Sequence, residues 1–373
     1  MAADEPGRGD YALVSAEAAE VSAPDLDYRP PKPKGRHPIA LVGAGGISFA
    51  HLDAYRAHGF EVAAILSRDE AKARARRDEF FPQAEVMTDY TALLARDDIA
   101  VVDLTPHPEE RVPLIEAALK AGKHVLSQKP FVNDLDTGER LCALAEANGV
   151  KLAVNQNGRW SPHMAWMRVA VRAGLIGEVL SVHCAIHWDH RWIRGTPFER
   201  MDDVVLFDFG VHWFDFVTSI LGRKADRVQA QAIHAPVTGI APPMLASALL
   251  GFGTAQGTLI FDAAAPQGPL DATYIAGSEG SLISTGPDLG NQSVALYTEA
   301  GVARPKLDGK WFNDGFAGAM GALLVAIETG AEPENSARGN LQTLANTFAA
   351  LQAARTGAAV VPGNARRRYP EPD

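Results

Sequence analysis

The stretch IALVGAGGIS, residues 39–48, decides the fold. A short apolar run ends in glycine here and leads into ISFAHLDAYRAH (47–58), which reads as a helix. Gly43, Gly45 and Gly46 let the backbone turn sharply and approach a pyrophosphate, and the first N–H groups of the next helix can bind that anion. The third glycine of the usual G-x-G-x-x-G pattern is Ser48, so a tight connection without a ligand is the alternative. Because another strand follows in register, the turn predicts a dinucleotide site that includes Ile47.

The strand–helix alternation continues after this turn. Helical segments separate further apolar runs, which are VAAILS (62–67), IAVVDLT (99–105), HVLSQKP (124–130) and VKLAVNQN (150–157). Short buried runs that alternate with helices indicate a parallel sheet covered on both faces. We therefore predict an α/β fold with a doubly wound (Rossmann) domain over residues 38–157, preceded by a proline-rich tail over 1–37.

The second half of the chain has a different pattern. LSVHCAIHWDH (180–190) alternates and places Leu180, Val182, Cys184, Ile186 and Trp188 on one face. Such alternation is typical of a half-buried strand in an antiparallel sheet. Further strand-like runs follow, and two helical segments (317–330 and 337–357) close the chain. We predict an α+β domain over residues 158–373.

Composition excludes several classes of partner. The net charge of −10 repels phosphate backbones, which excludes nucleic acid and disfavours an anionic membrane surface. Cys142 and Cys184 lie in apolar patterns, which predicts buried free thiols and fits a reducing cytoplasm. The acidic N-terminus lacks a signal-peptide pattern, and no run is long enough for a membrane helix. We expect a soluble cytoplasmic protein.

The end of the second strand predicts the cofactor's identity. An acid at this point would hold the ribose 2′-hydroxyl of NAD, but the chain has Ser67 and Arg68 instead. A hydroxyl and a guanidinium suit the 2′-phosphate of NADP, so NADP is favoured and NAD is the alternative. The two residues could also simply begin a surface helix.

Two later segments carry candidate catalytic groups. HVLSQKP places Lys129 at the carboxyl end of a parallel strand, where ligands of such sheets bind. LFDFGVHWFDFVTSILG (206–222) reads as one helix with Asp208, His212 and Asp215 on one face. The opposite, apolar face would consist of Phe209, Trp213, Phe216 and Ile220.

In this order, the glycine turn, the S-Q-K-P step (127–130) and D-F-G-V-H (208–212) resemble the glucose–fructose oxidoreductase / inositol dehydrogenase / MocA-type (Gfo/Idh/MocA) family. The likeness runs from about Ile39 to the final helix. It includes NQNGRWSPH (155–163) and ENSARGNLQTLANTFAAL (334–351). The resemblance implies a second domain with an open antiparallel sheet and a sugar, inositol or related alcohol as substrate.

The family's motifs transfer residue by residue. Its E-K-P lysine matches Lys129, and its D-x-x-x-H pair matches Asp208 and His212. Gln128 stands where the family has glutamate, and His107 is shifted from the usual histidine position after the T-P step. We take Thr105, His107, Gln128 and Asn157 as cofactor contacts.

These residues suit the oxidation of a secondary alcohol. His212 can take the hydroxyl proton near neutral pH, and Lys129 can stabilise the alkoxide. Lys129 could instead carry the proton if burial lowers its pKa. Asp208 would fix the imidazole or hold a substrate hydroxyl. A satisfied core histidine is the alternative for His212.

A histidine-rich strand is the other candidate site. His183, His187 and Asp189 share a face by strand parity, but no further ligand set accompanies them, so no metal site is predicted. We expect His187 and Asp189 to border the substrate pocket, with Arg159 as a further substrate contact. Trp188 and Trp192 could form a platform for a sugar ring or pack in the core.

The sequence therefore predicts an NADP- or NAD-dependent oxidoreductase that acts on a secondary alcohol or ketone of a sugar or polyol. Two alternatives remain, a glycosidase that recycles a bound nicotinamide and a non-catalytic nicotinamide-binding protein. A homo-oligomer through the second-domain sheet is expected, because open sheets often pair to protect a face.

Overall fold

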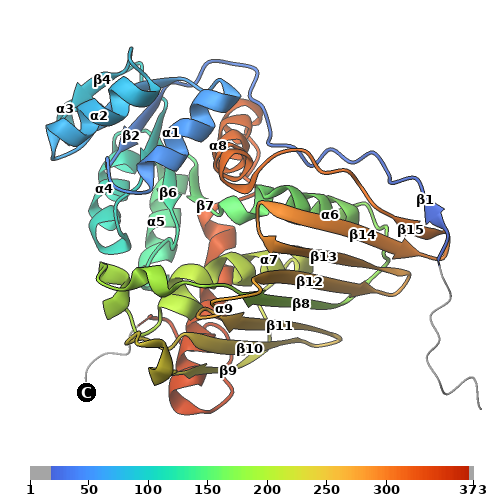
Figure 1. Ribbon diagram of the computed structural model, residues 1–373. Helices are drawn as coiled ribbons and strands as arrows, with labels where there is room; N and C mark the ends of the chain where they lie inside the picture. The colour runs from blue at the N-terminus through green and yellow to red at the C-terminus, as the bar shows by residue number, and fades with distance from the viewer. Residues whose placement is uncertain (1–17, 369–373) are drawn as a thin grey trace, which may run out of the picture.

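The computed structural model describes residues 18–368, which form two lobes built on two sheets (Figure 1). The first lobe contains a parallel sheet in the order β4-β3-β2-β5-β6-β7. Its strands are β2 (Ile39–Val42), β3 (Val62–Leu66), β4 (Glu85–Met87), β5 (Val101–Leu104), β6 (His124–Gln128) and β7 (Leu152–Asn155). Its helices are α1 (Ser48–His58), α2 (Glu70–Phe80), α3 (Tyr90–Leu94), α4 (Pro108–Lys120) and α5 (Leu135–Ala147).

The order of this sheet explains where a ligand can bind. Successive strands run outward from β2 in one direction and from β5 in the other, so the order reverses between them. Every residue of β2, β5 and β7 is buried, as expected for parallel strands covered on both faces. The doubly wound fold predicted from the sequence is confirmed, and its crevice opens at the carboxyl ends of β2 and β5.

The second lobe is built on a nine-stranded sheet in the order β1-β15-β14-β13-β12-β8-β11-β10-β9. Most pairs are antiparallel, but β8 pairs parallel with β11 and β1 with β15, so the sheet is mixed. The strands are β1 (Glu20–Val21), β8 (Val179–His187), β9 (Arg227–Ile233), β10 (Leu245–Phe252), β11 (Ala255–Asp262), β12 (Leu270–Gly277), β13 (Gly280–Asp288), β14 (Asn291–Thr298) and β15 (Gly301–Ala303).

Helices cover one face of this sheet, and the other face is open. They are α6 (Pro162–Arg172), α7 (Val211–Leu221) and α9 (Ala337–Thr356), whereas α8 (Trp311–Thr329) packs on α1 and β7 of the first lobe. On β8, Val182, Cys184 and Ile186 are buried towards the helices, whereas His183 and His187 are partly exposed on the outer face. Both cysteines are buried free thiols.

The described part of the N-terminal segment, residues 18–37, packs on the body (Figure 1). Its strand β1 pairs with β15, and the carbonyl oxygen of Pro31 lies so close to Gly321 of α8 that a Cβ there would be 2.1 Å away. The backbone N–H groups of Lys34 and Gly35 donate to the carboxylate of Glu328. The rest of the tail predicted over 1–37, residues 1–17, lies outside the described residues.

Helix α8 joins the lobes. Phe316, Met320 and Leu323 are buried in the same apolar cluster as Leu41 and Leu52 of the first lobe. The two lobes are therefore joined by a shared hydrophobic core. Within residues 18–368, none of the helices has the length and apolarity that a membrane crossing requires.

Candidate active site

A cleft of about 1080 Å³ lies between the lobes, at the crevice of the parallel sheet. The ends of β2, β3, β5 and β6 line one side, and the second lobe contributes residues from 188–213 and the start of α8. All ten predicted cofactor contacts lie on it, namely Gly43, Gly45, Gly46, Ile47, Ser67, Arg68, Thr105, His107, Gln128 and Asn157. The three predicted catalytic residues, Lys129, Asp208 and His212, also lie there.

The glycine turn has the geometry that a pyrophosphate needs. Gly43 has φ of +101°, and a Cβ on it would be 2.5 Å from Thr105 Oγ1, so a larger residue does not fit. A Cβ on Gly45 or Gly46 would meet nothing within 4 Å, because both border the open cleft. No side chain caps the start of α1, so the positive end of the helix dipole is open to an anion, although the N–H groups of Ser48 and Ala50 already donate to the carbonyl oxygens of Gly45 and Ile47. These residues fit the diphosphate of a dinucleotide.

At the end of β3, the side chains that face the cleft are mixed in charge. Arg68 is exposed and pairs with Glu110, with 3.2 Å between Nη2 and Oε1. Asp69 caps α2, since its side chain accepts from the N–H of Lys72, and this hydrogen bond lowers the pKa of the carboxyl. Ser67, Arg68 and Lys72 line the cleft together with Asp69 and Glu110. Each of the two cations is paired with one of these carboxylates, Arg68 with Glu110 and Lys72 with Asp69.

Lys129, Asp208 and His212 meet at the other end of the cleft. The ammonium of Lys129 donates to the carbonyl oxygen of Asp208 at 2.8 Å and lies 3.3 Å from its carboxylate Oδ1. His212 is 8% exposed, and its Nδ1 is buried without a hydrogen-bond partner among the described residues. Burial, and secondly the charge of Lys129, hold the pKa of His212 well below its ordinary value. The imidazole is therefore neutral at physiological pH.

The backbone that carries Asp208 and His212 differs from the prediction of one helix over 206–222. Residues Val204–Phe209 form a π-helix, and α7 begins only at Val211. Between them, a Cβ on Gly210 would be 2.7 Å from the carbonyl oxygen of Leu206. The π-turn precedes the helix and brings Phe209 as well as Asp208 to the cleft. The predicted division into a polar and an apolar face is thus wrong, because Phe209 and Trp213 line the cleft.

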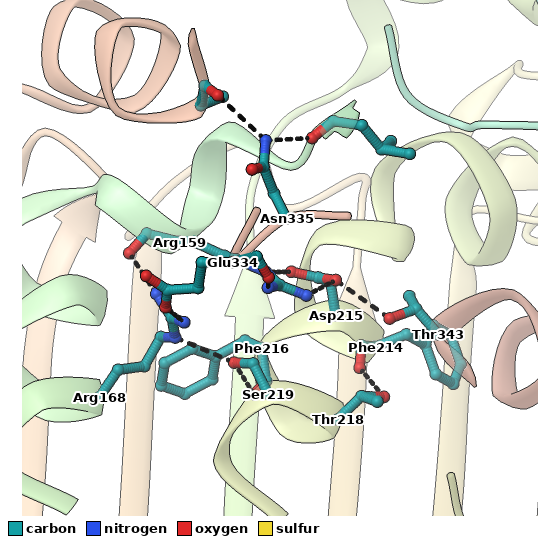
Figure 2. A network of polar contacts seen from close by, with 12 residues as sticks. Arg159, Arg168, Phe214, Asp215, Phe216, Thr218, Ser219, Glu334, Asn335 and Thr343 are labelled. Carbon is teal, nitrogen blue, oxygen red and sulfur yellow. Dashed lines mark hydrogen bonds and ion pairs between the residues drawn. The ribbon is translucent and has the colours of Figure 1, made fainter. Parts of the chain in front are cut away.

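Asp215 and Arg159 pair with each other, outside the cleft (Figure 2). Arg159 Nε lies 2.6 Å from Asp215 Oδ2, and Nη2 lies 2.7 Å from Oδ1. Thr343 donates to the same carboxylate at 3.0 Å. The prediction that Arg159 contacts substrate is therefore not supported. The pair instead joins the turn Asn157–Trp160 to α7, the helix that carries His212.

The predicted substrate contacts His187 and Asp189 also lie off the cleft. His187 is on the outer face of the sheet, 2.6 Å from Asp262, and Asp189 pairs with Arg191. The neighbouring residues of opposite parity, Trp188 and His190, line the cleft instead. The prediction that His187 and Asp189 share one face of the strand is separate from the prediction of which face borders the pocket. The pocket lies on the other face, which the helices cover. Among residues 18–368 no cluster of His, Cys, Asp and Glu is suited to a metal ion.

A buried polar network lies behind Gln128 and was not foreseen. Asp103 Oδ2 accepts from Tyr55 and from His51 Nδ1, both at 2.7 Å. His51 Nε2 faces the amide nitrogen of Asn155 at 3.3 Å, and the same amide donates to Gln128 Oε1 at 2.7 Å. These contacts orient the Gln128 oxygen inward and leave its NH₂ group towards the cleft. No sequence pattern links residues this far apart in the chain.

Arg111 is a further buried residue that the sequence analysis did not single out, and it positions the loop that follows Lys129. Its guanidinium is buried and donates to the carbonyl oxygens of Pro106, at 2.6 Å, and of Pro130. Burial lowers the pKa of Arg111 to about 9. The side chain fastens the loop after Lys129 to the loop after β5. An arginine in the first turn of a helix usually faces solvent, so its spacing gives no signal.

Family models match both lobes. Residues 38–156 match the oxidoreductase family with an NAD-binding Rossmann fold, and residues 164–283 match the GFO/IDH/MocA C-terminal domain. The chain belongs to the Gfo/Idh/MocA oxidoreductase family. The family resemblance noted from its motifs is confirmed, and so is its class as an oxidoreductase with a nicotinamide-dinucleotide-binding domain.

Similar proteins of this family include named sugar and inositol dehydrogenases. The D-apiose dehydrogenase of Paraburkholderia graminis is 27% identical over 86% of this chain and 88% of its own length. A myo-inositol dehydrogenase of Streptomyces leeuwenhoekii is 33% identical over 52% of this chain and 58% of its own. A solved oxidoreductase from Agrobacterium radiobacter, in complex with NAD⁺, L-tartaric acid and magnesium, shares the fold. Its TM-score is 0.80 at 22% identity, over 88% of this chain and 99% of that one.

Proposed function

We propose that this Gfo/Idh/MocA enzyme interconverts a secondary alcohol and a ketone on a sugar or polyol, with NADP(H) as the redox partner. The observation that carries the proposal is that the Lys129 ammonium lies close enough to the neutral His212 imidazole to lower its pKa, in the same cleft that the glycine turn lines. The names of the sugar and inositol dehydrogenases to which the chain is similar support the substrate class.

The residues divide the work as follows. The glycine turn and α1 hold the diphosphate, and Ser67, Arg68 and Lys72 hold the adenosine end. When bound, the nicotinamide supplies the two-electron acceptor. His212 accepts the hydroxyl proton of the substrate, while the Lys129 ammonium stabilises the negative charge that develops on that oxygen. Asp208 holds the ammonium in place. The substrate loses one hydride and one proton and becomes a ketone.

The test is direct. Purified protein is mixed with NADP or NAD and a panel of sugars and polyols, and reduced nicotinamide is followed by its absorbance. Turnover with at least one sugar or polyol is expected. Binding of neither cofactor in equilibrium dialysis would contradict the proposal.

The pH profile tests the role of His212. Because its pKa lies well below 6.5, His212 stays neutral and able to accept a proton as the pH falls through that value. We expect kcat/KM for alcohol oxidation to stay level through pH 6.5 and to fall only at lower pH. A loss of activity centred at or above pH 6.5 would contradict this assignment.

The charges at the end of β3 predict a preference for NADP. Arg68→Ala should raise the KM for NADP about ten- to a hundredfold, because one charge-assisted contact to the 2′-phosphate is lost. The KM for NAD should change little. Arg74→Ala is the matched control, since Arg74 lies on α2, which begins just after Arg68, pairs with Glu70 and does not line the cleft. An equal effect of Arg68→Ala on both cofactors would favour NAD as the partner.

We further propose that the outer face of the nine-stranded sheet pairs with a second copy of the chain. The face exposes apolar side chains on β9, β10, β11 and β12, of which β12 is separated from β11 by β8, and these side chains are Ile233, Leu249, Ile260, Leu270 and Tyr274. A patch of this kind is typical of a subunit interface. We expect an oligomer in sedimentation equilibrium, and the double variant Leu249→Glu/Ile260→Arg should shift it to the monomer. A monomeric wild-type protein would exclude this interface.

A further inference from the structure

The half of the cleft formed by the second lobe is a row of aromatic rings. The row begins beside His212, whose ring centroid is 5.7 Å from that of Trp311. It continues to Trp188 at 6.5 Å and then to His190 at 5.5 Å. All of these residues line the cleft.

The row then reaches the surface. His190 stacks on Phe209 with 4.2 Å between centroids, and Trp192 follows, 6.2 Å from Phe209 and 5.8 Å from Phe198. Trp192 is 55% exposed although it is a large apolar side chain at the cleft. The row thus extends from the catalytic end of the cleft to its mouth. One pyranose covers only a single aromatic ring, so the row is longer than one sugar needs.

The outer part of the row offers few hydrogen-bonding groups. The indole N–H of Trp192 donates to His190 Nδ1 at 3.2 Å, which engages both groups with each other. Burial lowers the pKa of His190 to about 4, so its ring is neutral. A free sugar or polyol carries a hydroxyl on nearly every carbon, and each hydroxyl that leaves water without a partner costs free energy. These ring faces suit an apolar, planar group instead.

Charge further restricts what this group can be. The cations that line the described cleft, Arg68, Lys72, Arg111 and Lys129, all belong to the first lobe. No lysine or arginine of the second lobe lines the cleft within the described residues. Of the two arginines that flank Trp192, Arg191 pairs with Asp189 and Arg194 donates to the carbonyl oxygens of Thr238 and Gly239, so both are already engaged outside the cleft. The outer half of the cleft is therefore suited to an uncharged aromatic group.

We propose that the substrate of this enzyme is an aryl glycoside, whose sugar lies at Lys129 and His212 and whose aromatic group packs against Phe198, Phe209 and Trp192. The proposal rests on the proposed oxidation for the sugar end, but the binding of the aromatic group can be measured independently of turnover.

The experiment compares phenyl and methyl glycosides of the same sugars, with glucose, galactose, mannose and xylose as the sugar. Both glycosides block the anomeric carbon, so they differ only in the aromatic ring. Their affinities for the NADPH-saturated full-length protein are measured by calorimetry. For at least one sugar, the phenyl glycoside should bind at least about tenfold more tightly than the methyl glycoside. Trp192→Ala should abolish most of this ratio, and Trp192→Phe, which keeps a ring, should preserve it.

The outcomes separate the two proposals. If no phenyl glycoside binds better than its methyl partner, or if Trp192→Ala leaves the ratio intact, the aromatic subsite is wrong. Tighter binding of UDP-glucose than of any phenyl glycoside would equally overturn it in favour of a nucleotide-linked sugar. Phenyl glycosides that bind in a Trp192-dependent way, yet never reduce NADP, would contradict the proposed oxidation and leave the subsite standing.

Discussion

Replacing Lys129 by methionine should lower kcat about a thousandfold, because the variant loses the ammonium that we propose stabilises the charge on the reacting oxygen. Methionine keeps the length and the apolar stem of lysine, so the loss reports on the charge. The affinity for NADPH should fall far less, since the diphosphate and adenosine contacts lie at the other end of the cleft. Stopped-flow measurement of a single turnover, together with equilibrium binding of NADPH, separates the two effects.

Lys120→Met is the control for this experiment. Lys120 belongs to the same lobe but lies exposed near the end of α4, outside the cleft. Wild-type turnover in Lys129→Met would exclude the proposed chemistry. Sugar release without any net reduction of NADP by the wild-type protein would point to the glycosidase alternative.

The parallel half of the fold was predictable because its signals are local. Each buried strand is a short apolar run, and the crevice follows from the order of strands and helices. The same is true of the cofactor contacts, because they occupy strand ends and the glycine turn. Gly43, Ser67 and Lys129 therefore all lie on the cleft.

The substrate half was less predictable because its residues are placed by packing between distant segments. Alternation along β8 gives two faces, but only the helices that pack on Val182, Cys184 and Ile186 decide which face is inside. The prediction chose the face of His187, and the structure places Trp188 and His190 on the cleft. Likewise, the π-helix before Gly210 brings Phe209 to the cleft, which regular α-helical spacing cannot show.

The network that surrounds Asp215 leads to the second large expected effect. Asp215→Ala should lower the free energy of unfolding by about 3–5 kcal/mol, because it leaves the guanidinium of Arg159 buried without its counter-charge. The side chains of Arg159 and Asp215 are only 8% and 2% exposed, and Figure 2 shows how the pair connects the turn after β7 to α7 and α9. Urea denaturation followed by circular dichroism measures the change.

Two comparisons decide whether the charge is the cause. Glu70→Ala breaks the exposed pair with Arg74 and should cost no more than about 0.5 kcal/mol, since water screens such a pair. Replacing both buried partners, in Arg159→Met/Asp215→Leu, removes the unpaired charge and should recover much of the stability. Full recovery of stability combined with reduced kcat would show that the pair positions α7 and therefore His212. An Asp215→Ala variant as stable as the wild-type protein would show that the network does not contribute to the free energy of unfolding.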